Sequence, residues 1–163
     1  MKLAGAVVLL TIATPLLAGS QVSASHAALA TPHPGATRVG VSILERGGNA
    51  IDAAVAVALV LSVVQPETAS IGGGGYLMYF DAKSGAVWSL DFREVSPIEA
   101  KSDTTLHAAT PGFLAGLDAM HKKFGALKWR ALVEPAAAAA REAAKGDLAA
   151  TLLRTAELGA REL

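Results

Sequence analysis

The chain has 163 residues, which is the size of one ordinary domain and enough to bury an apolar core. Its 14 lysines and arginines balance 14 aspartates and glutamates, and no dense basic run is present, so nucleic acid is not an expected partner. The absence of cysteine excludes a disulfide scaffold, a thiolate metal site, a cysteine nucleophile and a lipid-modified cysteine.

The first segment has the pattern of a secretory signal peptide. Lys2 gives a positive start, residues 3–18 are mostly apolar, and small residues surround Ala24. We predict a signal at 1–24, with cleavage after Ala24 or alternatively after Ala27, and a periplasmic or secreted chain. A membrane anchor is the alternative, but the apolar run is shorter than the roughly 20 residues of a span and contains proline. No stable membrane span is expected after signal removal.

Two helices are predicted after the proline-rich entry at 31–34. One face of the first helix carries the small and apolar residues Ala36, Val39, Gly40 and Ile43. Gly47-Gly48 is predicted to end it. Asn49 is expected to cap the second helix, at about 50–64, with Asp52 near the positive end of the helix dipole. Because Asp52 is its only charge, we expect the second helix to be buried at the centre of the fold.

Four consecutive glycines, Gly72–Gly75, follow the second helix. A phosphate-binding loop needs lysine and then serine or threonine after the last glycine, where this chain has Tyr76-Leu77. The dinucleotide pattern G-x-G-x-x-G ahead of a helix also fails, so no nucleotide cofactor is expected. Two explanations stay open from the residues alone: positive φ angles in a tight turn, or close approach of a neighbour or ligand to the bare backbone.

A β-hairpin is predicted next, with strands at 76–80 and 87–93 joined by a turn at 81–85. In the second strand, the face expected in the core carries Trp88, Leu90 and Phe92. The opposite, more polar face ends in Arg93. We expect Asp91, about 7 Å behind Arg93 on the same face, to help orient it.

The position of Arg93 suits recognition of a carboxylate. A guanidinium can bind a carboxylate with two parallel charge-assisted hydrogen bonds, which lysine cannot reproduce. The alternative is a surface ion pair of Arg93 with Asp91 or Glu94, which contributes little to stability. Both interpretations remain open from the residues alone.

Helices are predicted for the rest of the chain. Thr110-Pro111 is expected to open a helix ended by Gly125, with Asp118 on its exposed side. The apolar stripe of this helix is Phe113, Leu117, Met120 and Phe124. A short helix at 129–133 should lead to Pro135, followed by an alanine-rich helix at 136–144. A final amphipathic helix should bury Leu148, Leu152 and Leu153. His121 and the other three histidines lack metal-ligand spacing, so no metal is expected.

Several motifs in one order resemble the start of the large subunit of the γ-glutamyltranspeptidase family, also called glutathione hydrolases. They are Ala30-Thr31-Pro32-His33-Pro34, Gly47-Gly48-Asn49-Ala50-Ile51-Asp52-Ala53-Ala54, Gly72-Gly73-Gly74-Gly75-Tyr76 and Leu90-Asp91-Phe92-Arg93-Glu94. The likeness continues through Pro111-Gly112-Phe113-Leu114-Ala115-Gly116-Leu117, Phe124-Gly125 and Leu132-Val133-Glu134-Pro135-Ala136, and covers about residues 28–142.

The resemblance implies an α+β fold, namely an incomplete N-terminal-nucleophile hydrolase αββα sandwich, here mostly helices plus one β-hairpin. Family precursors are longer and cut themselves into two subunits, which frees a threonine at the start of the small subunit. That threonine attacks the γ-glutamyl carbonyl, and water or an acceptor amine resolves the acyl-enzyme. The family arginine that holds the α-carboxylate of the donor, such as glutathione, matches Arg93.

This chain departs from the family pattern because no threonine is followed by the small-subunit sequence. No catalytic residue is therefore assigned. We do not expect a nucleophile among the threonines Thr104-Thr105, Thr110, Thr151 and Thr155. We expect residues 25–163 to be an N-terminal portion of the large subunit, inactive alone. Its expected partners are a γ-glutamyl substrate, the remainder of the large subunit and the small subunit.

Without these parts, Trp88, Phe92 and the second helix are expected to lose packing partners, and the isolated chain is expected to be unstable or prone to aggregation. Two alternatives of other classes remain. One is a non-catalytic module that binds a small carboxylate. The other is a structural subunit that pairs with a separately encoded catalytic chain.

Overall fold

The computed structural model describes residues 23–96 and 109–158, so almost all of the predicted signal lies outside the described residues. The described chain contains five helices and a two-stranded antiparallel sheet, which agrees with the predicted α+β class. The elements are α1 (Pro34–Glu45), α2 (Ala50–Val64), β1 (Tyr76–Asp81), β2 (Ala86–Asp91), α3 (Phe113–Phe124), α4 (Trp129–Glu142) and α5 (Gly146–Leu158).

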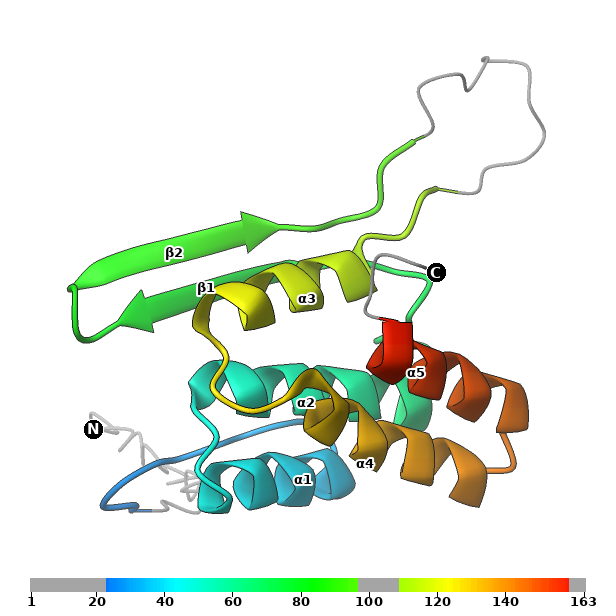
Figure 1. The fold of residues 1–163 in the computed structure, drawn as a ribbon, viewed down its shortest axis with the longest axis horizontal. Coiled ribbons are helices and arrows are strands. Elements are labelled where there is room, and N and C mark those ends of the chain that lie inside the picture. Colours follow the sequence, from blue (N-terminus) through cyan, green and yellow to red (C-terminus); the bar gives the residue numbers. More distant parts are fainter. Residues whose placement is uncertain (1–22, 97–108, 159–163) are drawn as a thin grey trace, which may run out of the picture.

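The elements are arranged around α2 (Figure 1). This helix contacts α1, α3 and α4, and α4 in turn contacts α5. The hairpin β1–β2 lies beyond α3, whereas α1 and α4 lie on the other side of α2. The hairpin and the pair α1–α4 are therefore on opposite sides of the molecule.

The two N-terminal helices confirm their prediction. Gly47 follows α1 with a φ of +86°, in the left-handed region that favours glycine. The Asn49 side chain accepts the N–H groups of Ile51 and Asp52, and the Asp52 carboxylate accepts the N–H of Asn49. These reciprocal bonds form a capping box, which satisfies backbone donors that have no partner inside the helix.

Helix α2 forms the centre of the apolar core, as predicted. Leu59 and Val55 are fully buried on this helix, and Leu132 and Leu152 are fully buried on α4 and α5. The expectation that α2 would lack partners is wrong, because α1, α3 and α4 cover it within the described chain.

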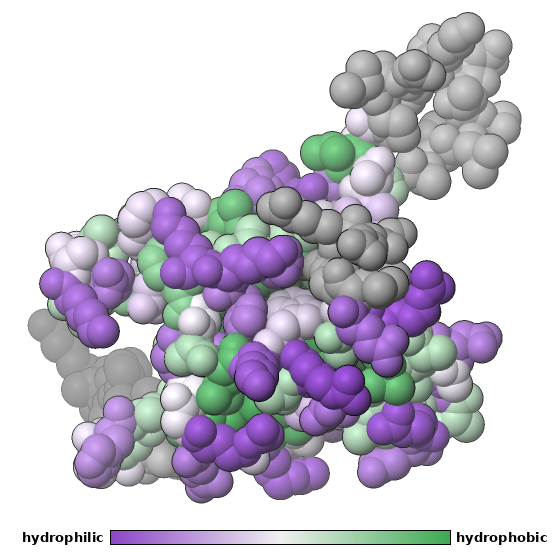
Figure 2. All heavy atoms as spheres, viewed as in Figure 1, coloured by the Kyte–Doolittle hydropathy of each residue, from purple (hydrophilic) through white to green (hydrophobic). Residues whose placement is uncertain are grey.

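The surface mixes side chains of both kinds: Figure 2 shows polar residues interspersed with apolar ones over the hairpin, α3 and α4. Among the residues that the structure describes, no helix is both long enough and apolar enough to cross a membrane.

The predicted hairpin is present, with Tyr76 opposite Asp91 at its open end and Asp81 opposite Ala86 at its turn. Its inner face contacts α3, where the Phe124 ring lies 4.7 Å from the Tyr79 ring and 5.5 Å from the Trp88 ring. Trp88 is nevertheless 39% exposed, so it belongs to the core less fully than predicted.

The outer face of the hairpin carries large side chains without a covering layer among the described residues. They are 61% to 77% exposed and comprise Tyr76, Met78, Phe80 and Val87. Monomeric proteins seldom expose contiguous apolar patches without an interaction role. The unpartnered surface is therefore this outer face, and not the second helix as expected from the sequence.

Helix α3 begins later than predicted, at Phe113. Thr110 does not cap it, because the backbone of Thr110 pairs with Val95 in an isolated antiparallel bridge. The carbonyl of Gly73 instead accepts the N–H groups of Gly112 and Phe113, at 3.1 and 2.9 Å. Donors at the start of α3 thus find their acceptor in the glycine run.

Two further predictions for the C-terminal helices are wrong. Asp118 is buried and not exposed, and its carboxylate accepts a 2.7 Å hydrogen bond from Lys122 one turn later. Helix α4 runs without interruption from Trp129 to Glu142 with Pro135 inside it, so the predicted break does not occur. Leu152 is buried, and Leu148 and Leu153 are half-buried, as predicted for α5.

Asp52 also joins α2 to the turn between α3 and α4. Its fully buried carboxylate accepts the N–H groups of Ala126 and Leu127 at 3.1 to 3.4 Å, and the Asn49 amide donates to the Phe124 carbonyl at 2.6 Å. The two capping residues therefore fix a segment far away in the sequence, a role that the sequence prediction missed.

Candidate functional site

Arg93 lies two residues beyond the end of β2, on the outer side of the hairpin. Its side chain is 58% exposed and its guanidinium donates to Asp91 twice: Nε to Oδ1 at 3.3 Å and Nη2 to Oδ2 at 3.2 Å. The backbone N–H of Arg93 also donates to Asp91, at 3.1 Å. This fork of two parallel hydrogen bonds fits the predicted orienting role of Asp91, and it is also the surface ion pair that the sequence left open as the alternative.

Tyr76 provides a second contact for Arg93, which the sequence prediction did not include. The guanidinium carbon lies 4.7 Å from the centre of the Tyr76 ring, within the range of a cation–π interaction. Tyr76 pairs with Asp91 across the hairpin, so all three residues share one face. The hairpin register was the signal that could have identified Tyr76.

The electrostatics of the site follow from this geometry. Two hydrogen-bond donors of Arg93 hold the pKa of the Asp91 carboxyl below its usual range. The Arg93 side chain is the larger cause and the Arg93 backbone N–H the smaller. The same carboxylate raises the pKa of Arg93, which stays charged. Both groups are exposed, so solvent screens the pair and it adds little to stability.

The glycine run lies against the backbone that carries Arg93. Gly75 pairs with Phe92 through two backbone hydrogen bonds of 2.9 and 3.4 Å. A Cβ added to Gly74 would lie 2.6 Å from the Cα of Arg93, too close for any side chain. None of Gly72–Gly75 has a positive φ. Of the two explanations that the sequence left open, close backbone approach is confirmed.

The described threonines show no activated hydroxyl. Thr155 is buried and donates to the carbonyl of Leu152, whereas Thr110 and Thr151 line a cavity of about 330 Å³ beside Ile71. The other described residues that line this cavity are Ile71, Pro111, Leu114 and Ala115, and none of them could serve as a base for either threonine. Thr104-Thr105 lie outside the described residues.

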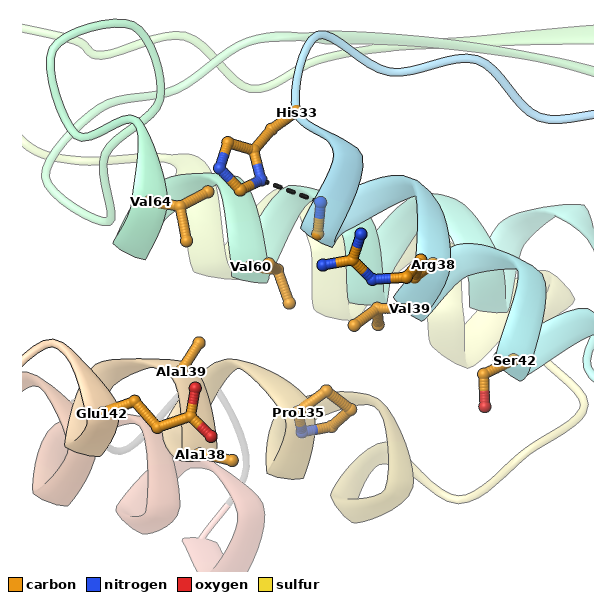
Figure 3. A pocket seen from close by; sticks show the side chains of 11 residues that line it. His33, Arg38, Val39, Ser42, Val60, Val64, Pro135, Ala138, Ala139 and Glu142 are labelled. Carbon is orange, nitrogen blue, oxygen red and sulfur yellow. Dashed lines mark hydrogen bonds between the residues drawn. The ribbon is translucent and has the colours of Figure 1, made fainter.

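A larger cavity, of about 480 Å³, lies between α1, α2 and α4 (Figure 3). His33 and Ser42 both line it, but they are nine positions apart along the chain, a helical rise of about 13 Å, so they cannot form a nucleophile–base pair. His33 Nδ1 accepts the N–H of Gly35 and caps α1. Helices α1 and α4, which line this cavity, lie on the side of α2 away from the hairpin (Figure 1).

In residues 23–96 and 109–158, no group of three or more histidine, aspartate or glutamate side chains could hold a metal ion. His121, the histidine considered from the sequence, directs Nε2 to the carbonyl of Leu127 at 2.8 Å.

Comparison with known proteins gives the class to which this hairpin and glycine run belong. Residues 36–157 match the family model described as Gamma-glutamyltranspeptidase. The chain is 37% identical over 137 residues to the glutathione hydrolase proenzyme of Escherichia coli K12, covering 74% of this chain and 23% of that protein. It is 40% identical over 126 residues to the corresponding proenzyme of Pseudomonas aeruginosa, covering 67% and 22%.

Solved structures agree with this assignment. The γ-glutamyltranspeptidase from Pseudomonas nitroreducens, solved with L-DON, superposes with a TM-score of 0.75 at 30% identity, covering 84% of this chain and 56% of that one. The enzyme from Helicobacter pylori gives a TM-score of 0.74 at 31% identity, covering 85% and 56%. The chain belongs to the γ-glutamyltranspeptidase family. It spans less than a quarter of the length of the Escherichia coli and Pseudomonas aeruginosa proenzymes.

Proposed function

We propose that this chain supplies the arginine that holds the substrate α-carboxylate in a γ-glutamyl-processing enzyme, and that it is inactive alone. The substrates are glutathione and related γ-glutamyl compounds, and the reaction is γ-glutamyl hydrolysis or transfer. Arg93 is the binding residue. The observation that carries the proposal is the exposed, pre-oriented guanidinium of Arg93 at the end of the hairpin.

The hydrogen bonds to Asp91 leave one edge of this guanidinium for a ligand. Asp91 occupies the edge formed by Nε and Nη2. A guanidinium presents five donors in a planar fork, so the edge formed by Nη1 and Nη2 can bind a second carboxylate. Asp91 and Tyr76 hold the side chain in place, which lowers the entropy lost when a ligand binds.

The proposed catalytic machinery lies in other parts of the enzyme. A threonine at the start of the small subunit attacks the γ-glutamyl carbonyl with its own α-amine as base, and water or an acceptor amine releases the product. The remainder of the large subunit and the small subunit complete an αββα sandwich. The exposed outer face of the hairpin supports this arrangement, because a second sheet packed on it would bury its large side chains.

The proposed location is the periplasm or the cell exterior, with residues 1–24 removed as a signal peptide. The first segment supports this location, because a positive start is followed by an apolar run and then by small residues.

The binding proposal can be tested with two isomers of one ligand. Glutamine keeps the α-carboxylate, whereas isoglutamine carries an amide at that position and keeps the γ-carboxylate. In NMR titrations of the chain labelled with ¹⁵N-arginine, glutamine is expected to shift the Arg93 Nε–H signal saturably. Isoglutamine is expected to bind at least about tenfold more weakly, as for the loss of one charge-assisted hydrogen bond.

Arg93→Lys is expected to weaken glutamine binding by about tenfold or more, because lysine keeps the charge but loses the fork. Arg46→Lys, at an exposed arginine after α1, is the matched control and should leave binding unchanged. Equal affinities for both isomers, or unchanged binding in Arg93→Lys, would overturn the proposed role.

Activity separates this proposal from its alternatives. The chain alone should release nothing from a γ-glutamyl anilide, and co-expression with a threonine-led partner chain should restore the release. Glutamine binding without any restored activity would instead favour a non-catalytic binding module.

A further inference from the structure

The position of Arg93 depends on the backbone beneath it. Its guanidinium contacts Asp91, two residues earlier, and the ring of Tyr76 across the hairpin. Both partners lie on the exposed outer face and cannot anchor the strand end to the core. Phe92, between Asp91 and Arg93, points to the other face and is half-buried. The packing of Phe92, together with its two backbone hydrogen bonds to Gly75, therefore fixes where the strand end lies.

Gly116 of α3 is the surface on which Phe92 rests. It is buried, and a Cβ added to it would lie 2.5 Å from Cβ and 2.6 Å from Cδ2 of Phe92. Carbon atoms in contact normally lie about 3.5–4.0 Å apart. A single methyl group at this position would therefore displace Phe92 by about 1 Å.

Gly112, one turn earlier, approaches the same segment. A Cβ added to it would lie 2.9 Å from the carbonyl carbon of Phe92 and 3.1 Å from the carbonyl oxygen of Arg93. Gly74 closes the opposite side, close to the Cα of Arg93. The segment is thus enclosed between the glycine run and α3, and the Gly73 carbonyl joins these two walls by accepting the N–H of Gly112.

We propose that Gly116 of α3 and Gly112, the N-cap residue of α3, are positioning residues that set the location of the Arg93 guanidinium. This inference rests on the proposed function of Arg93 as the carboxylate-binding residue. Helix α3 acts through backbone placement and touches no ligand. The spacing of four residues puts both glycines on one face of α3, toward the strand end.

The test compares Gly116→Ala with Gly146→Ala. Gly146, at the start of α5, has no atom within 4 Å of an added Cβ, so its variant controls for a glycine-to-alanine change in a helix. Two quantities are measured: the pKa of the Asp91 carboxyl by NMR titration, and the glutamine affinity. Asp91 faces Arg93 and Tyr76, with Glu94 nearby along the chain, and Arg93 is the main cause of its lowered pKa.

Gly116→Ala is expected to raise the pKa of Asp91 toward its usual value and to weaken glutamine binding by about tenfold or more, as for a lost charge-assisted hydrogen bond. Gly146→Ala should leave both unchanged. In the double variant Phe92→Ala with Gly116→Ala, the effect of the second change should be smaller than in the wild-type background, because the ring that the methyl group strikes is absent.

Phe92→Leu keeps both glycines and the apolar character of the contact, and it decides the question if Gly116→Ala does not fold. It should shift the Asp91 pKa in the same direction by less. An unchanged Asp91 pKa in folded Gly116→Ala would overturn the inference. If Gly116→Ala does not fold, an unchanged Asp91 pKa in Phe92→Leu would overturn it. The Asp91 titration needs no ligand, so a wild-type chain that fails to bind glutamine contradicts the proposed function and leaves this comparison valid.

Discussion

Replacing Asp52 with alanine is expected to lower the free energy of unfolding by about 3–5 kcal/mol. The Asp52 carboxylate is fully buried and accepts backbone N–H groups from Asn49, Ala126 and Leu127. Alanine offers no acceptor, so the variant leaves all three donors without their partner. The change removes the bonds that Asp52 makes to the turn between α3 and α4 and leaves only the bond from the Asn49 amide to the Phe124 carbonyl.

The magnitude follows from how many donors water can reach. A hydrogen bond to a charged group contributes about 1.5–3 kcal/mol, and a buried donor without an acceptor has a similar cost. Asn49 and Leu127 are half-buried, whereas Ala126 is exposed, so water can replace its lost acceptor. Two lost bonds give about 3–6 kcal/mol, and because their donors are only half-buried we expect the lower part of this range, about 3–5 kcal/mol.

Urea unfolding followed by far-ultraviolet circular dichroism measures this loss, because the free energy of unfolding falls linearly with denaturant. Asp147→Ala is the matched control: Asp147 lies in the first turn of α5 and is exposed, so its loss should cost below about 1 kcal/mol. Asp52→Asn should fall between them, since one amide oxygen can still accept. A value for Asp52→Ala within about 1 kcal/mol of the control would refute the reasoning.

Two other predictions concern α4 and the Arg93 site. Pro135→Ala is expected to raise the free energy of unfolding by about 1–3 kcal/mol, because the helix interior gains an N–H donor and loses a poor helix former. Thermal melts measure this effect, with Pro32→Ala, outside the helices, as the control. An unchanged or lower melting temperature for Pro135→Ala would contradict the prediction. Arg93→Gln is expected to raise the pKa of Asp91 in an NMR titration, since the Arg93 side chain is the main cause of its lowered value. The pKa of Asp91 is lower in the folded chain than in the unfolded chain. The small stabilisation by the Asp91–Arg93 pair is therefore present above the unfolded pKa and is lost as the pH falls through the folded pKa. An equal Asp91 pKa in the wild-type chain and in Arg93→Gln would show that the hydrogen bonds do not cause the shift.

Local signals in the sequence determined most of the secondary structure. Gly47 marked the end of α1 because its conformation needs positive φ, and Asn49 marked the start of α2 because its side chain caps backbone donors within three residues. The alternation in 87–93 likewise separated the inner face of the hairpin from the face of Arg93. These features depend on neighbours along the chain, so the sequence alone contained enough information for them.

The start of α3 shows where local signals failed. Thr110 followed by proline has the pattern of a helix start, yet the Gly73 carbonyl supplies the acceptor, and Thr110 pairs with Val95 instead. The same limit applies to Pro135, whose effect on helix propensity is outweighed by packing of the buried residues on either side of it in α4.

The sequence by itself determined the family motifs, the helices and hairpin, and Arg93 as the residue suited to a carboxylate. Only the tertiary structure decided what holds Arg93: the Asp91 fork, the Tyr76 ring, the Gly74 approach and the Phe92 contact with Gly116. It also decided the second role of Asp52, whose acceptor bonds reach residues 74 and 75 positions away. The physical reason is that caps and periodicity depend on neighbours within a turn or a strand, whereas close backbone approach depends on how separate elements pack together.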